Sequence, residues 1–179
     1  MAISSTIHVF DIELADADRH VYETLALRVA RHPSETAEYL LTRVLAYCLE
    51  YTEGITFSKG LSDPDEPTIA VRDLTGQLQA WIEIGAPDAA RLHKASKASP
   101  RVAVYTHREP RIFLRAYEGE RIHRAEALEL YAVDRTLLAE FVARLDRRLR
   151  FALTVTEGEL FMDFGGAHVA GRVERLALA

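Results

Sequence analysis

Cysteine is almost absent from this sequence, which has one, Cys48, among 179 residues. A single cysteine cannot form a disulfide within the chain, and it excludes a zinc site built from several thiolates. Long apolar runs are also missing, since no segment approaches the ~18 apolar residues that span a bilayer. The start of the chain has no basic segment and reaches Asp11 and Glu13 too early for a signal peptide. These absences predict a cytoplasmic protein without a membrane segment.

Several common catalytic motifs are missing as well. The sequence has neither of the glycine-rich loops that hold phosphates, G-x-G-x-x-G and G-x-x-x-x-G-K-[ST]. It also lacks the G-x-S-x-G turn of many serine hydrolases and the H-E-x-x-H zinc motif. Cys48 falls on the apolar stripe of a predicted helix, which indicates a small core residue rather than a nucleophile.

Charge is unevenly distributed along the chain, although the net charge is only −5. Residues 1–90 contain 15 acids and 6 bases, whereas residues 91–115 contain seven bases and a single acid, Glu109. The seven bases are Arg91, Lys94, Lys97, Arg101, Arg108, Arg111 and Arg115. The segment from Arg91 to Arg115 is therefore a candidate nucleic-acid contact, with a solvated helix face as the plainer interpretation.

Apolar periodicity predicts a chain that alternates between strands and helices. The expected strands are 6–14, 21–31, 55–59, 68–73, 77–85, 101–106, 127–133, 151–156, 159–164 and 168–174. The expected helices are 34–51 with Ser34 as N-cap, 87–98 with Pro87 in its first turn, a short one ending near Gly119, and 134–149. Without repeats or linkers, residues 1–179 are predicted to form a single α/β domain with a mixed sheet.

Two carboxylates form the strongest candidate site. Glu83 lies near the end of the predicted strand 77–85, and Asp65 lies in an acidic loop before the partner strand. A hairpin turn at 73–76 would place Asp65 opposite Ile84, one residue from Glu83, unless a bulge shifts the register. Such a pair suits Mg²⁺ or Mn²⁺, and its mutual repulsion predicts that Glu83→Gln raises the stability of the metal-free protein. The plainer interpretation is a solvated glutamate beside an acidic loop.

The predicted element order also carries a family resemblance. The αβββαβ order of residues 34–106 resembles the restriction-endonuclease-like core of the PD-(D/E)XK nuclease superfamily. More closely, the chain resembles the bacterial YaeQ family through RHPSET at 31–36, FSKGL at 57–61, DEP at 65–67 and WIEIG at 81–85, followed by Pro87-Asp88, Arg91 and Lys94-Ala95. The resemblance implies that core, extended by an N-terminal β-hairpin and C-terminal strands. It also implies metal binding by Asp65 and Glu83, with Glu38 as a further acid and Glu35 as second choice.

One position departs from the superfamily pattern. The expected lysine two residues after the acid is Gly85 here. Lys94 is the first candidate to replace it, and Lys97 and Lys59 are the others. The favoured hypothesis is Mg²⁺- or Mn²⁺-dependent hydrolysis of DNA or RNA by Glu38, Asp65, Glu83 and Lys94. The alternatives are a non-catalytic binding or regulatory module that retains the nuclease fold, and a metal site that serves stability alone.

Overall fold

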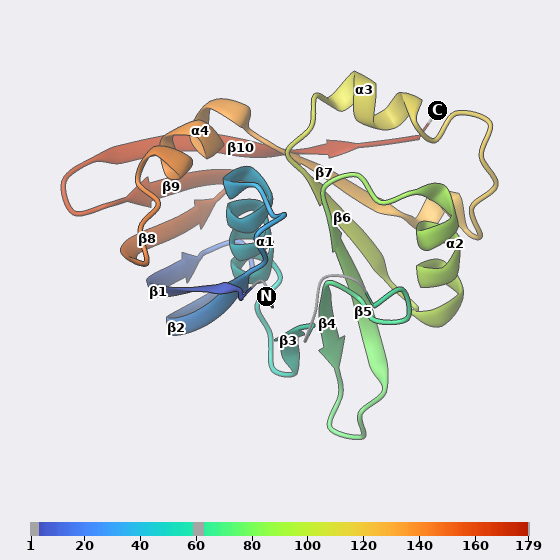
Figure 1. The fold of residues 1–179 in the computed structure, drawn as a ribbon, viewed down its shortest axis with the longest axis horizontal. Helices are drawn as coiled ribbons and strands as arrows, with labels where there is room; N and C mark the ends of the chain where they lie inside the picture. Colours follow the sequence, from blue (N-terminus) through green and yellow to red (C-terminus); the bar gives the residue numbers. More distant parts are fainter. Residues whose placement is uncertain (1–3, 59–62, 179) are drawn as a thin grey trace. The chain divides into compact units, whose positions relative to one another are not determined.

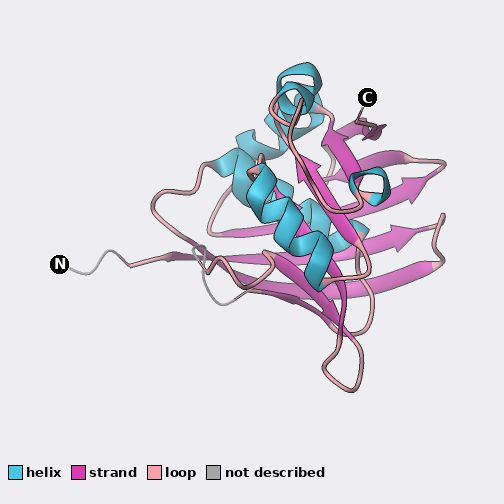
Figure 2. Cartoon of the chain, turned by 90° about the vertical axis from the view of Figure 1, so that its right-hand side faces the viewer, coloured by secondary structure: helices cyan, strands magenta, loops and turns pink. Residues whose placement is uncertain are grey.

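The computed structural model describes residues 4–58 and 63–178. The chain divides into two compact units, one made of residues 1–41 and 133–173 and the other of residues 42–132 and 174–179. Strands account for more of the chain than helices (Figure 2). Within the described residues, no helix has both the length and the apolar composition needed to cross a bilayer.

The first unit contains a five-stranded sheet in the order β2-β1-β8-β9-β10 (Figure 1). Its elements are β1 (Thr6–Asp16), β2 (Val21–Arg31), α4 (Arg135–Ala143), β8 (Arg148–Thr156), β9 (Glu159–Asp163) and β10 (His168–Leu176), of which β10 belongs to this unit up to Val173. β1 pairs with β8 in parallel, and the neighbouring pairs β1–β2, β8–β9 and β9–β10 are antiparallel.

The predicted N-terminal hairpin is confirmed. β1 and β2 pair from Thr6 opposite Arg31 to Asp16 opposite Val21. Alternate side chains of β1, from Phe10 onward, are buried, as the apolar alternation indicates. The hairpin therefore follows directly from a period of two in the sequence.

The helix predicted at 134–149 is too long. α4 ends at Ala143, and Arg148 already begins β8, where it lies opposite Val9 of β1. The helical apolar period continues to Leu145, but residues from Arg148 onward pair with β1 and form a strand. Tertiary pairing has overridden a local preference here.

The second unit also contains a five-stranded sheet, in the order β7-β6-β5-β4-β3. Its elements are α1 (Ala37–Leu49, from Thr42 onward), β3 (Ile55–Phe57), β4 (Ile69–Arg72), β5 (Leu78–Ile84), α2 (Ala89–Ala98), β6 (Val102–Thr106), α3 (Pro110–Arg115), a 3-10 turn (Ala125–Ala127) and β7 (Glu129–Val133). β3, β4 and β5 are antiparallel neighbours, while β5, β6 and β7 run parallel. The order α1-β3-β4-β5-α2-β6 is the αβββαβ order that the sequence predicts.

Two helices begin later than predicted because of their caps. The Thr36 hydroxyl accepts the Tyr39 N–H at 3.1 Å, so α1 begins at Ala37 and not at Ser34. The Asp88 carboxylate accepts the Arg91 N–H at 2.7 Å, so α2 begins at Ala89 and Pro87 precedes the cap. A side-chain acceptor at the N-cap satisfies an amide that the helix leaves open.

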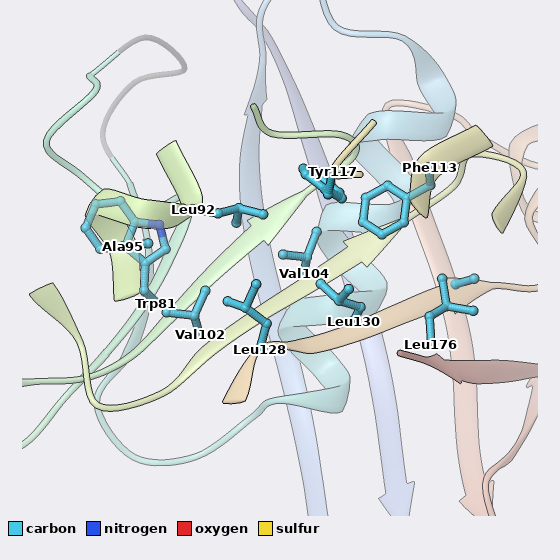
Figure 3. Close-up of a cluster of buried hydrophobic side chains, with 11 residues drawn as sticks. Trp81, Leu92, Ala95, Val102, Val104, Phe113, Tyr117, Leu128, Leu130 and Leu176 are labelled. Carbon is cyan, nitrogen blue, oxygen red and sulfur yellow. The ribbon is translucent and has the colours of Figure 1, made fainter. Parts of the chain in front are cut away.

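A core cluster covers one face of the second sheet. Trp81 of β5 lies beside Ala95 of α2 at one end, and Phe113 and Tyr117 lie at the other (Figure 3). The cluster also takes in Leu92 of α2, so α2 and the α3 segment pack on the same face of the sheet.

Gly54 joins α1 to β3 in a conformation that suits only glycine. Its φ is +89°, and a Cβ atom there would lie 1.9 Å from the carbonyl oxygen of Arg72. The Arg72 N–H donates to the Gly54 carbonyl at 3.1 Å, which explains the close approach.

Candidate functional site

The β4–β5 hairpin places Thr68 beside Glu83. The register pairs Ile69 with Ile82 and shifts between Val71 and Arg72, where a β-bulge interrupts the ladder. Continuing this register by one residue puts Thr68 opposite Glu83. The Thr68 hydroxyl donates to Oε2 of Glu83 at 3.0 Å, and its N–H donates to Oε1 at 3.3 Å. The predicted register, with Asp65 opposite Ile84, is therefore wrong by two positions.

Glu83 is a buried carboxylate whose partners come from the protein itself. Its side chain is 4% exposed. Besides Thr68, the Trp81 indole N–H donates to Oε1 at 2.6 Å, and Nη2 of Arg91 donates to the same oxygen at 2.8 Å. Buried charges are stable only when they are paired and hydrogen-bonded, and Glu83 meets both conditions.

Arg91 connects Glu83 to the acidic loop that carries Asp65. Its Nη2 also donates to the Glu66 carbonyl at 2.8 Å, and its Nη1 lies 3.5 Å and 3.4 Å from the carbonyls of Asp63 and Pro64. The guanidinium carbon lies 5.6 Å from the centre of the Trp81 ring. One guanidinium thus holds residues 63–66 against the end of β5, beside α2 (Figure 1).

Asp65 and Lys94 form an ion pair next to this clamp. Lys94 is one turn beyond Arg91 on α2. The Asp65 side chain is 74% exposed and that of Lys94 is 48% exposed. The structure therefore gathers three of the four predicted catalytic residues, Asp65, Glu83 and Lys94, around Arg91. The fourth, Glu38, lies exposed in the first turn of α1 and belongs to the first unit, so its role stays a prediction.

Gly85 occupies the position at which the resemblance to the nuclease superfamily predicts a lysine. The residue has φ of +85°, a left-handed conformation in which an L side chain is strained, and its N–H donates to the Tyr105 carbonyl at 2.8 Å. A lysine at this position would require a different strand end. Lys97 is exposed in the last turn of α2, and Lys59 lies outside the described residues.

The donor set in this arrangement does not fit a divalent metal. Oε1 of Glu83 accepts three donors and Oε2 accepts one, so the carboxylate has little capacity left. Asp65 is paired with Lys94. In the part of the chain that the structure describes, no three His, Cys, Asp or Glu side chains come close enough together to hold an ion.

The basic segment is only partly neutralised. Arg91, Lys94 and Arg101 are paired with acids of the same unit. Its other four bases are exposed and make no ion pair with residues of 4–58 or 63–178: Lys97, Arg108, Arg111 and Arg115. These four supply positive charge to the surface of the second unit.

A charge network on the opposite face of β6 was not foreseen from the sequence. Arg101 donates to both oxygens of Glu50, at 2.6 and 2.9 Å, and to both oxygens of Glu129, at 2.6 and 3.1 Å. Tyr105 donates to Glu50 at 2.6 Å and Tyr131 donates to Glu129 at 2.7 Å, with the two rings stacked 4.9 Å apart. No local spacing could reveal this network, because Glu50 and Arg101 are 51 positions apart.

The network shifts the titration of its members. Hydrogen bonds to Glu50 raise the pKa of Arg101, and burial raises the pKa of Tyr105 well above its ordinary value. Burial also acts to raise the pKa of Glu129, but hydrogen bonds from Arg101 and Tyr131 outweigh it, so that pKa lies below its usual value. The charged groups of this network are paired with and hydrogen-bonded to one another, which is typical of a structural role.

The chain is similar in sequence and structure to a family of bacterial proteins. The family model described as YaeQ protein matches residues 1–172. The YaeQ proteins of Escherichia coli (strain K12) and Salmonella typhi are each 32% identical over 164 residues, covering 90% of this chain and 90% of theirs. The crystal structure of YaeQ from Pseudomonas syringae has a TM-score of 0.84 at 30% identity, covering 97% of this chain and 96% of that one. The YaeQ structure from Xanthomonas axonopodis pv. citri has a TM-score of 0.85 at 29% identity, covering 98% and 100%. The chain therefore belongs to the YaeQ family.

Proposed function

We propose that this protein is a nucleic-acid-binding module built on a nuclease-like αβββαβ framework, in which Arg91 stands where an active enzyme would hold its metal. The observation that carries the proposal is the 2.8 Å pair between Arg91 and Glu83, made by a guanidinium that also binds the loop of Asp65. A fixed cation there neutralises the buried carboxylate without a metal. The glycine in place of the motif lysine supports the same conclusion.

The binding surface would be the exposed side of α2 and α3. Both helices pack through their apolar residues on the same core cluster, which leaves four of their basic residues exposed to solvent: Lys94, Lys97, Arg111 and Arg115. Residues 87–124 contain nine bases and four acids, a balance of +5 in a chain whose net charge is −5. Clustered Lys and Arg attract the phosphate backbone regardless of sequence, with an affinity that falls as salt rises.

Metal-dependent hydrolysis is the second candidate. It is favoured by the gathering of Asp65, Glu83 and Lys94 around one point, which a purely structural ion pair does not require. In this alternative Asp65 and Glu83 would be the ligands of Mg²⁺ or Mn²⁺, and Arg91 would have to leave Glu83.

The binding proposal is tested by fluorescence anisotropy with labelled single- and double-stranded DNA and RNA. Reversing two exposed charges of α3, with Arg111→Glu and Arg115→Glu together, should weaken binding and reduce the salt slope by about 0.9 for each lost contact to duplex DNA. Arg28→Glu is the matched control, because Arg28 is also exposed but lies on β2 in the first unit. An equal loss of affinity in the double variant and in Arg28→Glu would contradict the proposal. So would the absence of binding to any probe at about 50 mM salt.

The second candidate is tested with the same probes in Mn²⁺ and in EDTA. Fragments that appear only with Mn²⁺, and that disappear in both Glu83→Gln and Lys94→Met proteins, would establish hydrolysis and replace the binding module as the function. Binding without fragments from any of the four probe types supports the module.

A further inference from the structure

The first unit contains a hollow of about 410 Å³, which shares no residue with the Glu83–Arg91 site or the Arg101 network. It is formed by the start of β1, the end of β2 with Pro33, and the segment 145–147 before β8. Thr6 lies opposite Arg31 in the β1–β2 ladder, and the Val9 N–H donates to the Arg147 carbonyl at 2.7 Å. Two backbone pairings thus fix the three walls relative to one another.

Two guanidinium groups, of Arg31 and Arg147, line this hollow and have N–H donors that no described residue accepts. Nε of Arg31 donates to the Glu35 carbonyl at 3.2 Å, while its two terminal nitrogens have no partner within the described ranges. The side chain of Arg147 likewise forms no hydrogen bond or ion pair with any described residue. Arginine forks with unused N–H groups match the oxygens of phosphate and carboxylate groups.

The two histidines of the hollow have different roles. Nδ1 of His32 lies 2.7 Å from the Ser34 hydroxyl and accepts the Ser34 N–H at 3.1 Å. With Nδ1 as the acceptor, the ring N–H is on Nε2, which is then available to donate to a ligand. His8 is 5% exposed, and its Nδ1 donates to the Asp146 carbonyl at 2.9 Å. His8 is therefore a positioning residue that holds segment 145–147 against β1.

The charge and size of the hollow suit a small anion with an organic part. Asp146 is the one acid among the described lining residues, and one oxygen of Asp146 accepts the Arg147 N–H at 2.7 Å. The described lining thus carries two guanidiniums against one carboxylate, while the Glu35 carboxylate, which is not part of the lining, accepts the His32 backbone N–H at 3.1 Å. Pro33 and Leu145 add apolar surface, and the volume lies in the range of small-molecule sites.

We propose that this hollow binds a phosphate monoester, either of a mononucleotide or at the end of a nucleic-acid strand. A dianionic phosphate with three terminal oxygens can engage both guanidiniums and the His32 N–H together, which a single carboxylate with two oxygens does less completely. The site stands on residues of the first unit, so it does not depend on the function proposed for the second.

The test is calorimetric titration of the full chain with AMP, with adenosine, and with a short oligonucleotide that carries either a 5′-phosphate or a 5′-hydroxyl. We expect AMP or the phosphorylated oligonucleotide to bind at least 10-fold more tightly than its unphosphorylated counterpart. Tight binding of AMP would identify the ligand as a free nucleotide. Tight binding of the 5′-phosphorylated oligonucleotide alone would identify it as the end of a nucleic-acid strand. Equal binding with and without phosphate, or no binding of either phosphorylated probe, would overturn the proposal.

Variants locate the binding in the hollow. Arg147→Met keeps the backbone bond to Val9 and should weaken phosphate binding at least 10-fold, as should Arg31→Met. Arg28→Met is the matched control on the same strand and should bind like the unmodified protein. A loss in the Arg28 variant equal to that in the Arg147 variant would place the binding elsewhere. Arg111→Glu with Arg115→Glu should leave it unchanged, which separates this site from the proposed surface of α2 and α3.

Discussion

Glu83→Gln should destabilise the protein, which is the opposite of what the sequence predicts. Two carboxylates side by side would repel, and removing one charge would then stabilise the metal-free fold. In the structure the nearest charged group is instead the Arg91 guanidinium, 2.8 Å from Oε1. Glutamine removes the charge that opposes Arg91 and turns an NH₂ group toward donors that Glu83 now accepts from Trp81 and Thr68.

The size of the effect follows from the burial of the pair. Removing one partner of a buried ion pair costs about 3–5 kcal/mol. Arg91 is 24% exposed and keeps its contacts to the loop carbonyls, so the cost here should be lower, about 2–3 kcal/mol. For a protein of this size, that loss lowers the melting temperature by about 4–12 °C.

The measurement is reversible thermal unfolding followed by circular dichroism, repeated in urea. Asp65→Asn is the control: its side chain is 74% exposed and should change stability by less than about 0.5 kcal/mol. Arg91→Met should also destabilise, and the double variant with Glu83→Gln should lose less than the sum of the two. If Glu83→Gln melts at the same temperature as the unmodified protein or at a higher one, the ion pair with Arg91 is refuted. The two-carboxylate metal site would then be the favoured interpretation.

Three further outcomes are expected from single positions. Gly54→Ala should lower the free energy of unfolding, measured by chemical denaturation, far more than Gly76→Ala does. Both glycines have positive φ, but of the two only Gly54 has backbone atoms within 4 Å of an added Cβ, so equal losses of stability in the two variants would contradict this reasoning. Cys48 should react slowly with a thiol reagent in the native protein and rapidly after unfolding, because it is fully buried, so fast native labelling would contradict its place in the core. Glu129 should support folding above its unfolded pKa near 4.5 and lose that support as pH falls through its lower folded pKa. The melting temperature should therefore fall less steeply with decreasing pH in Glu129→Gln than in the unmodified protein. The same dependence of melting temperature on pH in both proteins would show that Glu129 does not contribute.

Most of the fold could be predicted because its signals are local. All ten strands and the helices lie where the periodicity indicates, with strand ends that differ by at most three residues. The errors fall at ends where another group decides: Thr36 and Asp88 cap their helices later than expected, and β1 takes residues that continue a helical period after Ala143. Whether residues 1–179 are one domain stays a prediction, since the contacts group them into two units.

The site could be predicted only as a neighbourhood. The strand end and the start of α2 are adjacent in sequence, and the predicted hairpin returns the acidic loop to them, so it follows that Asp65, Glu83 and Lys94 lie near one another. Their partners do not follow. A two-position difference in hairpin register, made by the turn and one bulge, puts Thr68 opposite Glu83 and brings Arg91 to its carboxylate.

The sequence alone determined the element order, the apolar faces, the burial of Cys48 and the resemblance to the YaeQ family, because period, composition and motifs are properties of neighbouring residues. Only the tertiary structure decided which charges meet. Arg91 pairs with Glu83, Arg101 joins Glu50 to Glu129, and Arg31 and Arg147 line one hollow. The energy of a charge depends on the distance to its partner and on burial, and both are set by strand order and register rather than by spacing along the chain.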